Sequence, residues 1–158
     1  MHMIRRATAA DAATLADMRS ASHAERYTGD ARRVEAFRAE CLQYFERELA
    51  RDDGYLRAWL AADATKGDRL VGTASLTLVP TLPRIADDGR QIDARVRNVY
   101  VLPDARRRGV ARALMQILID EVKASGLRRV TLGTSVMGRS LYESLGFRDK
   151  DDEMQLVF

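Results

Sequence analysis

The sequence has few of the residues that mark membrane, secreted or disulfide-linked proteins. A single cysteine, Cys41, among 158 residues cannot form an internal disulfide, so a reducing cytoplasm is the expected compartment. No apolar run approaches the roughly 18 residues that cross a bilayer. The first segment, MHMIRRATAADAAT, is positively charged but lacks an apolar stretch, so we expect no secretory signal. These absences exclude a disulfide framework and a membrane partner.

The residues that are present are those of an ordinary globular protein. Hydrophobic residues make up 46% of the chain and charged residues 31%, which is too apolar for a disordered chain. Because single domains usually contain about 100–150 residues, we predict that residues 1–158 form one domain.

Positive charge is only slightly in excess. The chain has 26 basic residues, 23 of them arginine, against 23 acidic ones, and most basic residues have acidic neighbours. A nucleic-acid-binding protein would gather its basic residues without such neighbours. The mixed charges therefore predict no nucleic-acid partner. The one run of three basic residues without acidic neighbours is Arg106-Arg107-Arg108.

The periodicity of apolar residues predicts both helices and strands along the chain. Apolar residues three and four apart predict helices at 11–24, 34–51, 108–124 and 138–145. Runs of β-forming residues predict strands at 3–8, 55–62, 70–80, 92–102 and 128–133, with a closing strand or hairpin near the C-terminal MQLVF. The predicted order is β-α-α-β-β-β-α-β-α-β, or the same order with the last strand doubled. It predicts an α/β (α+β) fold: a mixed, mostly antiparallel central sheet with helices on both faces.

The segment VRNVYVLPDARRRGVARALM contains the clearest functional signal. A strand ends at Pro103, an arginine-rich loop follows, and a helix begins after Gly109. The first N–H groups of a helix have no intrahelical partner, and the helix dipole favours negative charge there. Gly109 lets a ligand approach the backbone, and arginines add donors for phosphate oxygens. The loop lacks the Lys-Ser/Thr of an ATP-binding loop and the spaced glycines of a dinucleotide-binding turn.

Two motifs together resemble the GNAT superfamily of acyl-CoA-dependent N-acetyltransferases. The first is the Arg/Gln-x-x-Gly-x-Gly/Ala loop, here Arg106-x-x-Gly109-x-Ala111, which follows Val101-Leu102-Pro103. The second is Leu-Tyr-x-x-x-Gly-Phe, here Leu141-Tyr142 to Gly146-Phe147. A strand separates the two motifs, and the predicted element order is similar to the family's fold over almost the whole chain.

The resemblance implies that acetyl-CoA is the co-substrate and indicates how it would bind. No metal is expected. The loop would wrap the pyrophosphate with its backbone amides, and it consists of Arg106, Arg107, Arg108, Gly109, Val110 and Ala111. The pantetheine arm would pair with the strand that contains Val99, Tyr100 and Val101, where a bulge would aim an N–H at the thioester oxygen. For the side chain of Tyr100, facing the acceptor and simple packing both remain open.

The resemblance also assigns the catalytic residue. Tyr142 matches the tyrosine that protonates the departing thiolate, a role that suits a phenol still protonated at pH 7. Ser135 stands where the family often has an asparagine that contacts pantetheine. No general base is obvious, and Asp93, His23, Glu25 and water all remain candidates.

We therefore expect a cytoplasmic acetyltransferase that moves acetyl from acetyl-CoA to a primary amine by direct attack in a ternary complex. The alternative is a non-catalytic acyl-CoA-binding or sensor module. The acceptor, a small molecule or a peptide, would lie among residues 22–33, 81–91 and the acidic closing turn. That turn would suit a cationic acceptor or would simply be solvated. A homodimer through an edge strand is compatible with the pattern but not required by it.

Overall fold

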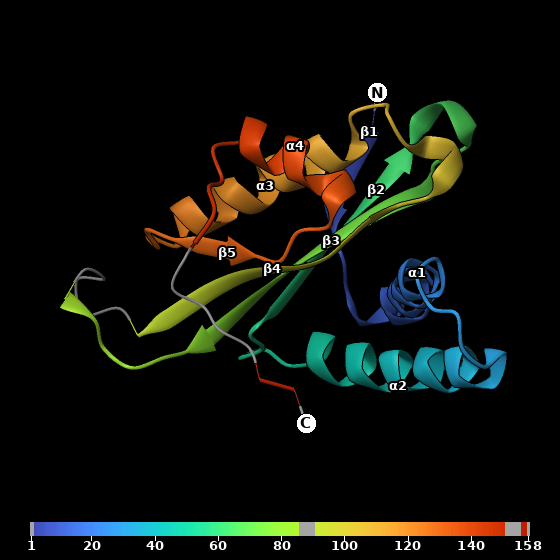
Figure 1. Ribbon diagram of the computed structural model, residues 1–158, viewed down its shortest axis with the longest axis horizontal. Helices are drawn as coiled ribbons and strands as arrows, with labels where there is room; N and C mark the ends of the chain where they lie inside the picture. Colours follow the sequence, from blue (N-terminus) through green and yellow to red (C-terminus); the bar gives the residue numbers. More distant parts are fainter. Residues whose placement is uncertain (1, 86–90, 151–155, 158) are drawn as a thin grey trace.

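The computed structural model describes residues 2–85, 91–150 and 156–157. A five-stranded sheet runs through the centre, with helices above and below it (Figure 1). The principal elements are β1 (His2–Arg6), α1 (Ala12–Ala24), α2 (Ala31–Leu49), β2 (Leu56–Asp63), β3 (Arg69–Pro80), β4 (Ile92–Val101), α3 (Val110–Ala124), β5 (Val130–Leu132) and α4 (Val136–Ser144).

The strands lie in their sequence order, β1-β2-β3-β4-β5. The first four pair antiparallel with their neighbours, and β5 joins β4 in parallel. A parallel neighbour needs a crossover connection, and α3 supplies it. The structure thus confirms the predicted mixed, mostly antiparallel sheet.

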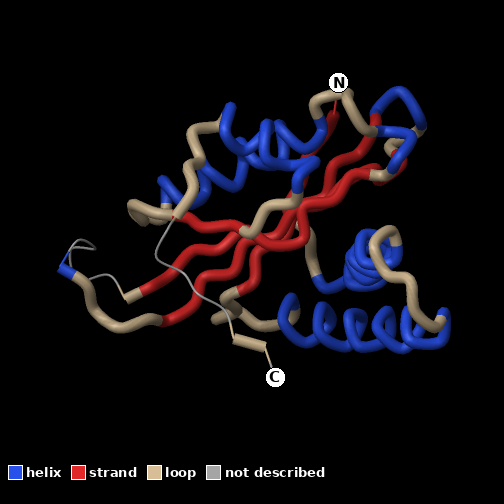
Figure 2. Tube along the Cα trace, in the orientation of Figure 1, coloured by secondary structure: helices blue, strands red, loops and turns tan. Residues whose placement is uncertain are grey.

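The two pairs of helices cover opposite faces of the sheet, as the tube in Figure 2 shows. Helices α1 and α2 pack on one face, where Leu15, Phe45 and Leu60 are buried. Helix α3 covers the other face, where Leu114 and Leu118 pack against Trp59. The alternation of β2 side chains explains this division, because Leu60 and Trp59 point to opposite faces. Cys41 is buried in the first of these cores.

Local signals set the start of α1 and the end of α3. Before α1, the side chain of Asp11 accepts a hydrogen bond of 2.8 Å from the backbone N–H of Thr8, which completes a capping box. After α3, Gly126 has a φ of 68°. The Leu127 N–H then reaches the Val122 carbonyl at 3.2 Å, which ends the helix in a Schellman-type turn.

The closing strand is the main difference from the predicted order. Residues 148–150 and 156–157 do not form a strand, and Leu156 and Val157 are exposed. The rest of the predicted hairpin, residues 151–155, lies outside the described residues, as do residues 86–90 of the loop before β4. Within the described ranges, no helix combines the length and apolarity that a bilayer span requires.

Candidate active site

The arginine-rich loop has an unusual backbone conformation between β4 and α3. Residues Pro103–Ala105 form a short 3-10 helix, after which both Arg107 and Gly109 have positive φ, 64° and 81°. Gly109 takes this conformation without strain, whereas Arg107 does so at a steric cost. Alternating backbone conformations of this kind turn successive N–H groups toward a common point.

These N–H groups are available to a ligand. Across the described chain, none of the backbone N–H groups of residues 107–112 donates a hydrogen bond, and the first bond of α3 runs from Ala113 N to Gly109 O at 3.0 Å. A Cβ built on Gly109 would have no heavy atom within 4 Å, so the space in front of it is open. Free amides at the start of a 15-residue helix form an anion-binding site.

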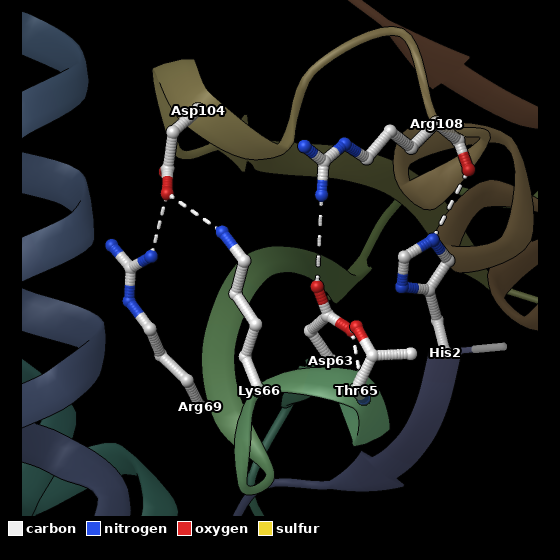
Figure 3. A network of polar contacts seen from close by, with 7 residues as sticks. All are labelled: His2, Asp63, Thr65, Lys66, Arg69, Asp104 and Arg108. Atoms are coloured by element: carbon white, nitrogen blue, oxygen red, sulfur yellow. Dashed lines mark hydrogen bonds and ion pairs between the residues drawn. The ribbon is translucent and has the colours of Figure 1, made fainter.

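A polar network fixes the loop against the β2–β3 turn (Figure 3). Asp104 accepts from Arg69 at 2.6 Å and from Lys66 at 3.5 Å. The guanidinium of Arg108 lies 3.8 Å from the Asp63 carboxylate. The backbone carbonyl oxygen of Arg108 lies 3.1 Å from His2 Nε2. Because Arg108 points at Asp63, its side chain is already engaged within the protein.

Arg106 is engaged on the other side of the loop. Its Nε donates to the Val101 carbonyl at 3.0 Å, and its Nη2 donates to Glu25 Oε1 at 2.6 Å. The Tyr100 hydroxyl donates to the same Glu25 oxygen at 2.8 Å. Of the three arginines, only Arg107 has no side-chain hydrogen bond or ion pair to the described residues.

The Glu25 carboxyl group is stabilised in its charged form. Partial burial opposes the charge, but hydrogen bonds from Tyr100 and Arg106 outweigh it and lower the pKa of Glu25. The pKa of the Tyr100 hydroxyl is raised, because burial disfavours its charged form and the hydrogen bond to Glu25 holds its proton. Tyr100 is 7% exposed and packs in the α1/α2 core.

Strand β4 contains a bulge just before Tyr100. Thr73 pairs with Tyr100 while Ser75 pairs with Arg97, so β4 has one residue more than β3 over this stretch. Asn98 absorbs the extra residue with a φ of 53°, a conformation that asparagine tolerates better than most residues. The resemblance predicted a bulge here, and the structure places it at Asn98.

The outer edge of β4 is open beyond this point. Strand β5 pairs with β4 only at Ala94, Arg95 and Val96. From Asn98 to Val101, no described strand lies on that side of β4. An open edge can pair with an extended ligand as though it were another strand.

Tyr142 lies on α4, which follows β5. Its ring packs edge-on against Phe147 at a centroid distance of 6.0 Å, and burial raises the pKa of its hydroxyl. Gly138 makes room for the ring, because a Cβ there would lie 2.8 Å from Tyr142 Cε2. Ser135 is the N-cap of the same helix but makes no side-chain capping bond.

The three candidate bases lie in different surroundings. Asp93 is at the opposite end of β4 from Val101, in ion pairs with Arg84 and Arg129. Eight residues of strand separate it from Val101 by about 26 Å. The His23 ring lies tilted against the Phe37 ring, with a centroid distance of 4.7 Å, beside a cavity of about 450 Å³ between α1 and α2. Burial, Arg19 and Arg26 together lower the pKa of His23.

The Glu25 contacts were not predicted, since Glu25 and Arg106 are 81 residues apart and no spacing signal connects them.

In the described part of the chain, no three His, Cys, Asp or Glu side chains gather closely enough to hold a metal ion.

Comparison with known proteins identifies relatives of both the sequence and the fold. The acetyltransferase (GNAT) family matches residues 16–147. Glucosamine 6-phosphate N-acetyltransferase of Trypanosoma brucei brucei is 34% identical over 88 residues, which are 56% of this chain and 57% of that protein. The [ribosomal protein bS18]-alanine N-acetyltransferase of Escherichia coli strain K12 is 38% identical over 60 residues, 36% of this chain and 40% of that protein.

The matched segments thus span about half the length of these curated relatives or less. The fold is shared over a greater length. A predicted acetyltransferase from Clostridium acetobutylicum, crystallised with acetyl-CoA, superposes with a TM-score of 0.83 at 23% identity, over 99% of this chain and 96% of that one. The family match covers both motifs and most of the chain, and this chain therefore belongs to the GNAT family of N-acetyltransferases.

Proposed function

We propose that this chain, as one GNAT domain in the cytoplasm, transfers an acetyl group from acetyl-CoA to a primary amine by direct attack. One observation carries the proposal: the free amides of residues 107–112 lie directly after the open, bulged edge of β4. Together they suit a ligand with a polyanionic end and an extended arm. Acetyl-CoA has that shape, and when bound it supplies a reactive thioester.

The residues present fit such a ligand. Gly109 leaves its side of the loop open, and the backbone amides of Arg107, Arg108, Val110 and Ala111 would bind the pyrophosphate together with the free side chain of Arg107. Arg106 would act differently, because its side chain holds Glu25 and the carbonyl of Val101. Its role would be to fix the loop rather than to bind phosphate.

The open edge of β4 would position the thioester. Val99, Tyr100 and Val101 would offer backbone groups to the extended arm, and the Asn98 bulge would turn an N–H toward the thioester oxygen. A preorganised donor at this position stabilises the negative charge that develops in acyl transfer. Ser135 would add a contact from the start of α4.

Tyr142 would donate its phenolic proton to the sulfur as the C–S bond breaks and the C–N bond to the amine forms. Its raised pKa supports this role, because the hydroxyl remains protonated and able to donate at neutral pH. The proton lost by the amine needs another acceptor. The low pKa of Glu25 and the remote place of Asp93 leave His23 or water for that step.

The acceptor class is open in the family. The two relatives named above act, by their names, on a sugar phosphate and on the alanine of a ribosomal protein. Both acceptors present an amine, so a small-molecule or peptide amine is the proposed acceptor here. The proposal requires neither a nucleic acid nor a membrane, and a homodimer would be compatible with it.

A thiol-release assay with acetyl-CoA and a panel of primary amines tests the function. We expect free CoA to form only when an amine is present, with an equal amount of acetylated amine. The alternative, a non-catalytic acyl-CoA-binding module, predicts that acetyl-CoA binds but that no amine of the panel is acetylated.

A further inference from the structure

Strand β4 carries arginines on the face that α1 and α2 cover, next to the bulge. Ala94 and Val96 pack in the core beneath α3, so the alternating residues Arg95 and Arg97 face the α1/α2 side. Arg19 of α1 comes close to the same place: it lies over the Phe37 ring at 5.8 Å and contributes to the electrostatics of Arg97. We call Arg19, Arg95 and Arg97 the arginine cluster.

No acidic side chain of the described residues forms an ion pair with the arginine cluster. Two neighbouring arginines differ in this respect, since Arg38 pairs with Asp17 and Arg33 with Glu40. Partial desolvation lowers the pKa of Arg97, and the positive charges of its two neighbours lower it further. Three cations that repel one another and have no acidic partner among the described residues favour the binding of an anion.

Two hydrogen-bonding groups, one within the arginine cluster and one next to it, are buried and lack a partner in the described structure. Ser75 is 1% exposed and lies directly opposite Arg97 in the β3–β4 register, but its hydroxyl has no hydrogen-bond partner in the described structure. The Nε of Arg95 is likewise buried without a partner. Buried donors without partners are costly and therefore rare, and an anionic ligand would satisfy both.

We propose that the acceptor amine carries an anionic group, a carboxylate or a phosphate, that binds to Arg19, Arg95 and Arg97. Guanidinium groups match the paired oxygens of both anions. This inference rests on the proposed function, because Arg97 directly precedes the Asn98 bulge where the acetyl group would lie. An anion held there would bring the amine of a small acceptor to the thioester.

Matched acceptor pairs test the proposal. Glycine is compared with glycinamide, and phosphoethanolamine with ethanolamine, in the same acetyl-transfer assay. We expect one anionic member to react with a kcat/KM at least tenfold above that of its neutral partner, and the better pair distinguishes carboxylate from phosphate. Equal rates within both pairs would overturn the proposal but leave the acetyltransferase function intact.

Two variants test whether the preference for an anionic acceptor depends on Arg97. Arg97→Gln should lower kcat/KM for the anionic acceptor at least tenfold, while the Kd for acetyl-CoA stays within twofold. Arg51→Gln is the matched control, since the Arg51 side chain is exposed in a surface ion pair with Asp53 just after α2, and it should change neither quantity. Loss of acetyl-CoA binding in the unmodified protein would instead contradict the proposed function itself.

A second measurement does not depend on turnover. Inorganic phosphate or acetate is titrated into protein saturated with acetyl-CoA, so that the loop before α3 is occupied, and the arginine Nε–H signals are followed by NMR. We expect a saturable shift that disappears in Arg97→Gln. No shift, or a shift that persists in the variant, would contradict an anion site at the arginine cluster.

Discussion

Glu25 and Arg106 form an ion pair of 2.6 Å that joins the end of α1 to the loop before α3. Tyr100 of β4 donates to the same carboxylate oxygen, so one side chain connects three elements around the candidate site. Because these contacts lower the pKa of Glu25, the carboxylate is a poor proton acceptor. We therefore infer that Glu25 holds Arg106 and Tyr100 in place rather than accepting a proton.

Replacing Glu25 therefore tests a positioning role against a catalytic one. Glu25→Gln keeps an acceptor for Tyr100 but loses the charge that pairs with Arg106. We expect the KM for acetyl-CoA to rise about three- to tenfold and kcat to change less than about twofold, which matches the modest energy of a partly exposed ion pair. Steady-state kinetics across pH measures both. A fall in kcat of about 100-fold, with loss of the acidic limb of the pH profile, would make Glu25 the general base.

Gly109→Glu should abolish acetyl-CoA binding. The substitution forces a side chain into a φ of 81° and places a negative charge in front of the free amides. Gly67→Glu is a matched control, because Gly67 also has a positive φ, 62°, and open space but lies in the β2–β3 turn. Calorimetry on both variants should show binding only for the control. Equal affinities would remove the loop from the cofactor site.

Tyr142→Phe removes only the hydroxyl. The edge contact of the ring with Phe147 remains, so the protein should fold normally. If Tyr142 protonates the departing thiolate, kcat should fall about 100-fold or more, while the Kd for acetyl-CoA changes little. The same change at Tyr55, which lies just before β2 and outside the proposed site, should have no effect on kcat. Unchanged turnover in Tyr142→Phe would show that the proton comes from elsewhere.

Stability at low pH should depend on Asp11. Arg5 and Thr8 donate to its carboxylate and lower its pKa from 3.8 to about 2. Because the pKa is lower in the folded state, this stabilisation is complete above about pH 4 and is lost as the pH falls toward 2. Asp11→Asn should reduce the free energy of unfolding by about 1–2 kcal/mol at pH 7. Urea titrations should show this gap closing between pH 4 and pH 2, and a gap independent of pH would contradict the assignment.

Much of the fold could be predicted from local patterns. The apolar stripe of Val110, Leu114 and Leu118 predicts both the existence of α3 and its buried face, because a helix repeats every 3.6 residues. Pro103 and Gly126 bound that segment for the steric reasons that apply in any sequence. The candidate anion-binding loop is equally local, since its free amides follow from a helix that begins after Gly109.

The remaining features of the site depend on contacts between distant segments. Arg19 and Arg97 are brought together by the packing of α1 on the sheet, and no periodicity records that contact. The bulge at Asn98 depends on the register with β3, which local sequence does not specify. From the sequence, the acidic turn either suits a cationic acceptor or is simply solvated, whereas the arginine cluster supports an anionic acceptor.

Calorimetric titration of the purified protein with acetyl-CoA, free CoA and ATP tests the central claim most directly. The account predicts micromolar binding of both CoA forms and at least tenfold weaker binding of ATP, because the loop and the open edge of β4 together select a pyrophosphate with an extended arm. Absence of binding by either CoA form, or equal binding of ATP, would contradict it.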